Sequence, residues 1–106
     1  MPTYVVMQVK VNDPETYRKY VKLSPALIKR YGGRFLTRGG SITTQEGEPF
    51  TDRMVILEFP SKDKFDAFYS DSDYAEAVKF RHSASIGSVL VQEGVPEGAE
   101  APAANV

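Results

Sequence analysis

The stretch Thr3–Glu15, TYVVMQVKVNDPE, decides how the fold is read because it joins a strand pattern directly to a helix start. Over Thr3–Val11, alternate residues form one wholly apolar face and one mixed face, which is typical of a strand covered on both sides for much of its length. Asp13 can accept hydrogen bonds from first-turn amides, and Pro14 suits the first helical position because its missing N–H would be unpaired there. The sequence therefore predicts a strand over residues 3–11 and then a helix.

Apolar residues at helical spacing continue after Pro14 and predict a helix face that packs on the sheet. Pro25 lies inside this pattern, so we expect the helix to kink or break near Ser24. Gly32-Gly33 predicts the end of the helix, because glycine adopts the left-handed C-terminal cap conformation at little cost. The members of the apolar face are Tyr17, Tyr20, Val21, Ser24, Leu27, Ile28 and Tyr31.

The second strand pattern, about Arg34–Glu46, is interrupted by Gly39-Gly40. Paired glycines in a strand indicate a bulge, a bend, or the close approach of another backbone or a ligand. A hairpin-type connection over residues 47–52 leads to a third predicted strand, Arg53–Phe59. Alternation in this strand predicts one face with Val55, Leu57 and Phe59, and another with Met54, Ile56 and Glu58.

The rest of the chain predicts a helix, a break and a last strand. Ser61 can cap the helix, and Ser72 can cap a second helical piece after a break at residues 70–73. The last strand is expected over about Ile86–Glu93. Residues 95–106 lack bulky side chains, so we expect one domain over residues 1–94 and a flexible tail over residues 95–106.

The resulting order, strand-helix-strand-strand-helix-strand, is the ferredoxin-like βαββαβ plan of an α+β domain. This plan has a four-stranded antiparallel sheet with its helices on one face. Because both sheet faces carry apolar residues, the uncovered face must be buried against something, and a homodimer through that open face is the expected solution.

Composition excludes several classes of function. The 106 residues contain no cysteine, which rules out disulfides and thiolate chemistry. A net charge of -1 gives no electrostatic footprint for nucleic acid. No run approaches the roughly 18 apolar residues of a membrane span. We therefore expect a cytoplasmic protein that binds neither nucleic acid nor membrane.

Arg38, directly before Gly39-Gly40, is the most specific local signal for a ligand site. Its planar guanidinium suits a carboxylate or phosphate, and the glycines allow a ligand close to the backbone. The structural alternative is an ion pair between Arg38 and Glu58 on neighbouring strands. The spacing does not match a phosphate-binding loop.

Two residues are candidates for moving a proton. His82 is the only histidine, the residue type suited to proton transfer near neutral pH, although a position near a helix end also suits a surface or capping role. Glu58 lies beside Met54 and Ile56, where partial burial would favour proton transfer and an arginine partner would favour a structural role. With one histidine and no cysteine, no protein-only metal site is expected.

Tyr17, Tyr69 and Arg81 complete the candidate ligand-binding residues. The tyrosines lie at helical spacing, which is typical of core rings with a polar end, and they can also line a pocket between helices and sheet. Arg81 can pair with Asp71 or Asp73, or it can reach an anionic group on a ligand. The sequence leaves these alternatives open.

Several short motifs, in one order from Met1 to about Gly94, resemble the family called "domain of unknown function 1330". They are Asp13-Pro14, Tyr17, Tyr20, Gly32-Gly33-Arg34-Phe35-Leu36, Arg38-Gly39-Gly40, Glu58-Phe59-Pro60, Phe68-Tyr69, Ser72, Tyr74, Arg81 and Val91-Gln92-Glu93-Gly94. The resemblance implies the dimeric α/β-barrel superfamily, in which two ferredoxin-like subunits place their sheets face to face. Relatives there include cofactor-free monooxygenases, isomerase-like and dehydratase-like enzymes, and haem enzymes.

Two function classes follow from the residues and the resemblance. The first is a small cofactor-independent enzyme in which Arg38 orients an anionic or carbonyl group while Glu58 or His82 moves a proton. The second is a non-catalytic dimeric module that binds or senses a small molecule. Fold analogy alone does not choose between them.

Overall fold

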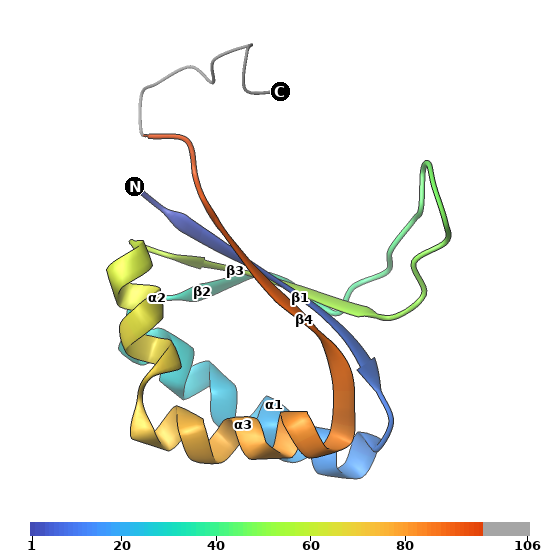
Figure 1. Cartoon of the computed structure of the whole chain (residues 1–106), viewed down its shortest axis with the longest axis horizontal. Coiled ribbons are helices and arrows are strands. Elements are labelled where there is room, and N and C mark those ends of the chain that lie inside the picture. Colours follow the sequence, from blue (N-terminus) through green and yellow to red (C-terminus); the bar gives the residue numbers. More distant parts are fainter. Residues whose placement is uncertain (97–106) are drawn as a thin grey trace.

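The chain follows the predicted order βαββαβ, with its second helical region in two pieces (Figure 1). The computed structural model describes residues 1–96, so most of the predicted tail lies outside the described residues. The elements are β1 (Thr3–Val11), α1 (Pro14–Arg30), β2 (Arg34–Arg38), β3 (Arg53–Phe59), α2 (Lys62–Tyr69), α3 (Ser72–Ala84) and β4 (Ser85–Glu93). The predicted bounds of the first and third strands are confirmed.

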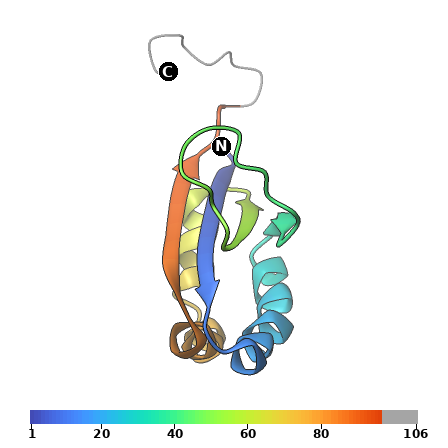
Figure 2. The ribbon, with the colours of Figure 1, turned by 90° about the vertical axis from the view of Figure 1, so that its right-hand side faces the viewer.

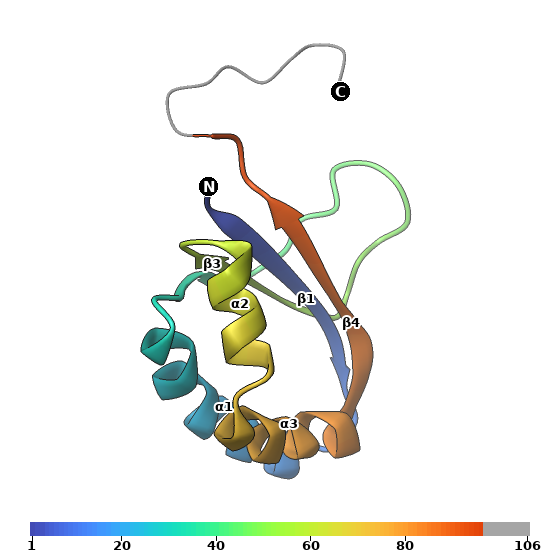
Figure 3. The ribbon, with the colours of Figure 1, turned by 60° about the vertical axis from the view of Figure 1, so that its left-hand side comes forward.

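The four strands form one antiparallel sheet in the order β2-β3-β1-β4. All three helices lie on one side of it, as the views in Figures 1 and 3 agree. The connection over residues 39–52 projects away from the helices, beyond the other side of the sheet (Figure 2). The fold is therefore the predicted ferredoxin-like sheet with one covered and one open face.

The strand register separates a covered face from the open face. Val5 lies opposite Leu57 on β3 and Val91 on β4, and both Val5 and Leu57 are fully buried beneath the helices. The next residue, Val6, points to the open face, where its neighbours in register are Ile56 and Leu90. This alternation confirms the two faces predicted from the sequence.

Helix α1 is continuous through Pro25, so of the kink or break predicted near Ser24 the break is wrong. In a regular helix the residue at position 25 would donate its N–H to the carbonyl of Val21, and proline has no N–H to donate. The Arg38 guanidinium supplies a substitute donor, with its Nη2 3.1 Å from the Val21 carbonyl oxygen. The helix remains continuous because a side chain from β2 satisfies the carbonyl that Pro25 leaves free.

Strand β2 ends at Arg38, well before the predicted Glu46, and its irregularity lies between Phe35 and Thr37. Gly39 has a φ of 74°, a conformation that disfavours other residues. A Cβ on Gly39 would lie 2.2 Å from the Nη1 atom of Arg53. The close neighbour of Gly39 is thus the side chain of an arginine on β3, and not another backbone.

The helical caps are partly as predicted. Asp13 caps α1, and the Ser61 hydroxyl accepts a hydrogen bond from the Lys64 amide at the start of α2. Helix α3 is capped by Asp71, and the prediction of Ser72 is wrong. A carboxylate oxygen of Asp71 accepts bonds from the amides of Asp73 and Tyr74, at 2.7 and 3.3 Å.

Candidate ligand site under strand β4

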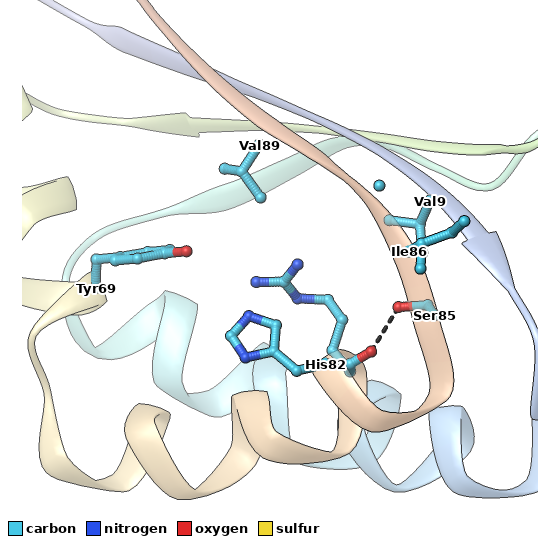
Figure 4. A pocket seen from close by; sticks show the side chains of 8 residues that line it. Val9, Tyr69, His82, Ser85, Ile86 and Val89 are labelled. Carbon is cyan, nitrogen blue, oxygen red and sulfur yellow. Dashed lines mark hydrogen bonds between the residues drawn. The ribbon is translucent and has the colours of Figure 1, made fainter.

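A cavity of about 550 Å³ lies between the first half of β4 and the two helices α2 and α3 (Figure 4). Its polar groups come from the helices and from the α3–β4 junction, while β1 and β4 supply apolar side chains. Small-molecule pockets are usually mostly apolar, whereas polar groups form the larger share of this lining, which suits a polar or charged ligand. The lining residues are Val9, Tyr69, Arg81, His82, Ser85, Ile86, Gly87 and Val89.

Arg81 is the chemically decisive member of this lining. Its side chain leaves α3 toward the sheet, so that the residue is only 7% exposed, and its Nε and Nη2 atoms are buried without a hydrogen-bond partner. The predicted pairing with Asp71 or Asp73 is wrong, because both carboxylates bind Arg30, at 2.9 and 3.0 Å. Asp71 and Asp73 lie in the first turn of α3, two to three turns from Arg81, which explains the difference.

Aromatic groups surround the Arg81 guanidinium. Its Cζ atom lies 5.4 Å from the centroid of the Tyr20 ring. Burial works against the charged form of Arg81, but the nearby phenol groups of Tyr74 and Tyr20 outweigh this effect and raise the pKa of the guanidinium. The site therefore holds a permanent positive charge next to an aromatic wall.

The aromatic wall is held by a buried hydrogen bond between the hydroxyls of Tyr20 and Tyr74, whose oxygens are 2.9 Å apart. Burial, with the adjacent phenol, raises the pKa of Tyr20, and burial also raises the pKa of Tyr74. Both phenols stay neutral at physiological pH and neither compensates the charge of Arg81. Tyr20 and Tyr74 thus link α1 to α3 directly behind the cavity.

The mouth of the cavity carries three polar side chains. His82 is exposed, and Tyr69 is 43% exposed at the end of α2. Figure 4 shows both side chains facing the same space as Val89 of β4. The Ser85 hydroxyl donates to the carbonyl oxygen of Arg81 at 2.5 Å, which fixes the junction between α3 and β4. Of the sequence candidates, Tyr69, Arg81 and His82 are therefore brought together.

The apolar side of the cavity was not found from the sequence. Gly87 lies opposite Val9, and a Cβ on Gly87 would meet the carbonyl oxygen of Gln8 at 1.9 Å. A lone glycine within the last strand was the available signal for this close approach of β4 to β1. On the open face, Ile86 and Gly87 also line a second hollow of about 250 Å³, together with Gln8, Lys10, Phe50, Asp52 and Ser88.

The other two charged candidates lie away from this cavity and from each other. Arg38 stacks on the Phe35 ring, 4.4 Å from its centroid, and Glu58 instead pairs with Arg34 at 3.3 Å. Arg38 lies in register with Val55 on the helix side, whereas Glu58 lies opposite Tyr4 on the open face. The expected Arg38–Glu58 ion pair is therefore wrong, and the two residues do not line one pocket.

Tyr17 and the paired glycines also fall outside the Arg81 cavity. Tyr17 borders an inner cavity of about 20 Å³ that Arg38 and Arg53 also line, which has room only for water. Gly39 is covered by Arg53, and Gly40 has no atom within 4 Å of the position of a Cβ. The ligand role of this region is not supported by its geometry.

Within residues 1–96, no three His, Asp or Glu side chains come together in a way that could hold a metal ion. None of the helices in this part of the chain has the length and apolar character needed to cross a bilayer.

Solved structures with the same arrangement include proteins with and without a stated activity. A protein of unknown function from Rhodopseudomonas palustris, RPA0582, is 24% identical, with a TM-score of 0.75 over 90% of this chain and 83% of its own. SnoaB, a cofactor-independent oxygenase from Streptomyces nogalater, is 14% identical, with a TM-score of 0.61 over 93% and 98%. HapK from Hahella chejuensis is 17% identical, with a TM-score of 0.61 over 96% and 100%. Comparison with curated protein sequences finds no match.

The sheet order, the one-sided helices and these similarities define an α+β protein with a ferredoxin-like fold. Residues 2–95 match the model of the family described as "Domain of unknown function (DUF1330)", and the chain belongs to that family. The resemblance seen in the sequence motifs is confirmed.

Proposed function

We propose that this protein is a small enzyme that acts on a small organic molecule in the Arg81 cavity without a tightly bound cofactor. The observation that carries the proposal is the buried Arg81 guanidinium, whose Nε and Nη2 atoms have no hydrogen-bond partner, at the wall of a cavity of about 550 Å³. A carbonyl or anionic oxygen of the substrate would lie at this guanidinium. Arg81 thereby takes the orienting role that the sequence suggested for Arg38.

The chemistry that fits these residues is proton transfer at a carbon next to a carbonyl group. His82 would take the proton from carbon, and the electron pair of the broken C–H bond would move onto the carbonyl oxygen. The Arg81 charge would stabilise the resulting enolate, because a fixed charge in a partly dry site acts on the oxygen where negative charge develops. A positioned base such as His82 contributes about 10²- to 10⁴-fold to such a step.

The fold is compatible with this proposal by analogy. SnoaB, which shares the fold, is described as a cofactor-independent oxygenase. This likeness shows only that such a scaffold can hold chemistry of this kind in a relative. The argument for activity in this chain rests on Arg81 and His82.

Hydrogen–deuterium exchange tests the enzyme proposal. We expect the protein to accelerate exchange of the α-protons of 2-tetralone or phenylpyruvate in D₂O, followed by proton NMR. His82→Gln should reduce the rate by about 10²-fold or more while the protein stays folded. Ser83→Ala is a matched control, because Ser83 is an exposed neighbour of His82 outside the cavity lining.

The second candidate function is a binding module that uses the same cavity without turnover. It is favoured by the exposure of His82, which leaves the proposed base in solvent. Binding of a small molecule with no acceleration of exchange for either ketone, and no effect of His82→Gln, would support this candidate and contradict the enzyme proposal.

We also propose that two copies associate through the open sheet face. Supporting this, Leu90 on β4 is 56% exposed and lies in register with Val6, which in turn faces Ile56 of β3. An apolar strip across three strands with no helix over it is a surface that soluble monomers rarely expose.

A further inference from the structure

The Arg81 cavity carries a positive charge that the described residues do not neutralise. No Asp or Glu lines the cavity, and none of the ion pairs within residues 1–96 includes Arg81. The carboxylates at the start of α3, Asp71 and Asp73, are engaged by Arg30. Burying a charge without a counter-charge is costly, so the site is built for a ligand that brings negative charge.

The free atoms of Arg81 indicate the shape of that negative group. Nε and Nη2 lie on the same edge of the guanidinium, and both are buried and unpartnered. This edge presents two parallel N–H donors, which match the two oxygens of a carboxylate in a planar bidentate pair. A single ketone oxygen would satisfy only one of the two donors.

The position of Arg81 at the end of α3 indicates how much negative charge the ligand carries. Arg81 lies in the last turn of α3, which ends at Ala84, so the negative end of the helix dipole borders the site. Phosphate groups are favoured at helix N-termini, where amides point at the ligand, and this end offers carbonyls instead. A singly charged carboxylate therefore suits the site better than a phosphate dianion.

We infer that the ligand is a small monocarboxylate whose two oxygens pair with Nε and Nη2 of Arg81 and whose apolar body packs on Val9 and Val89. This inference rests on the proposed function and names the class of its substrate, a carboxylate with an adjacent carbonyl such as phenylpyruvate: the carboxylate pairs with Nε and Nη2, and the same charge stabilises the enolate oxygen beside it. Tyr69 is the most exposed aromatic neighbour of the guanidinium, at 43% against 4% for Tyr20 and 1% for Tyr74. Because Nε and Nη2 are buried, a side chain beside them must move to admit the ligand, and we expect Tyr69, the most exposed of these rings, to be the one that moves.

Calorimetric titration of the full chain with matched probes tests the inference. We expect phenylacetate to bind at least tenfold more tightly than its neutral analogue phenylacetamide, and more tightly than phenyl phosphate. Arg81→Met should abolish the preference for phenylacetate. Lys79→Met is the matched control, because Lys79 lies on the same helix but is exposed and bound to Glu76 at 3.1 Å.

A measurement on the unmodified protein covers the case in which Arg81→Met does not fold. Phenylacetate should move the Nε–H signal of Arg81 in a nitrogen–proton NMR spectrum, and phenylacetamide should not. Equal affinities for phenylacetate and phenylacetamide, tighter binding of phenyl phosphate, or no binding of phenylacetate at millimolar concentration would overturn the inference. If phenylacetate shifts the Nε–H signals of other arginines but not that of Arg81, the inference is overturned as well.

The two proposals fail separately. Accelerated exchange of 2-tetralone without a preference for phenylacetate would leave the enzyme proposal standing and remove the carboxylate inference. Selective binding of phenylacetate without accelerated exchange of any ketone would support the carboxylate inference and contradict the enzyme proposal.

Discussion

Arg38 stabilises a helix that contains a proline by donating to the carbonyl that the proline cannot reach. The bond runs from Nη2 of Arg38 to the oxygen of Val21, four residues before Pro25. We expect Arg38→Met to lower the free energy of unfolding by about 1 kcal/mol, the usual contribution of one such bond. Urea unfolding at a fixed protein concentration measures this change.

A double-mutant cycle isolates the bond. Pro25→Ala restores an N–H at position 25, so the Val21 carbonyl no longer needs Arg38 and the cost of Arg38→Met should fall to a few tenths of a kcal/mol. Arg34→Met is the matched control on the same strand, because Arg34 pairs with Glu58 on the open face. An equal cost of Arg38→Met with and without Pro25 would contradict this role.

The sequence identified Arg81 and His82 as candidates but could not show their surroundings. The sequence left open whether Arg81 pairs with Asp71 or Asp73 or reaches a ligand, and in the structure both acids bind Arg30 of α1 instead. The apolar wall of the cavity depends on how β4 curls over α3, which no local pattern encodes. Gly87 was the one residue in the sequence that indicated close packing of β4 on β1.

At the scale of elements, Asp71 joins the end of α1 to the start of α3. Its carboxylate caps α3, binds Arg30 and accepts a short hydrogen bond from the Tyr31 hydroxyl. The Tyr31 hydrogen bond is the main reason that the pKa of Asp71 is lowered from 3.8 to about 2. One carboxylate thus fastens two helices that are far apart in the sequence.

Because the pKa of Asp71 is lowered, the contacts that it makes between α1 and α3 are sensitive to acid. The stabilisation by Asp71 is complete above its ordinary pKa of 3.8 and is lost as the pH falls toward about 2. We expect Asp71→Asn to lower the unfolding temperature at pH 7 and to flatten its decline between pH 4 and pH 2. Thermal unfolding followed by circular dichroism checks this.

Two variants sharpen the acid experiment. Tyr31→Phe should reproduce part of the effect of Asp71→Asn, since it removes the main cause of the lowered pKa. Asp66→Asn should leave the acid profile unchanged, because Asp66 forms only an exposed pair with Lys62 on α2. A profile that Asp71→Asn does not alter would show that other groups control acid unfolding.

The elements themselves were predictable where one rule dominated. Alternation alone placed β1 and β3, because their buried face is continuous. Strand β2 was predicted too long, since the residues after Gly39 retain strand-like composition but have no neighbouring strand beyond Arg38. The break at Pro25 was predicted from the helix sequence alone, whereas the donor that satisfies the free Val21 carbonyl is a side chain of strand β2.

At the scale of the whole molecule, association through the open face can be tested with one charge. We expect Leu90→Lys to convert a dimer to a monomer, because it places a charge in the exposed end of the apolar strip that Leu90 forms with Val6 and Ile56. Native mass spectrometry and light scattering measure the mass. The control is Leu23→Lys, since Leu23 is 46% exposed but lies in the groove between α1 and α3.

The outcome of this pair of variants is decisive. A dimer that dissociates in Leu23→Lys but not in Leu90→Lys would place the contact on the helices, and a wild-type monomer at micromolar concentration would contradict association through the sheet.

Ile86 and Gly87 line hollows on both sides of β4, the Arg81 cavity on one side and the open-face hollow on the other. A second copy seated on the open face would therefore press on the same two residues that wall the cavity. If pairing of two copies raises the affinity for a ligand by some factor, binding of that ligand raises the affinity of the two copies for each other by the same factor. Dilution of the protein would then weaken ligand binding, and ligand would hold the two copies together.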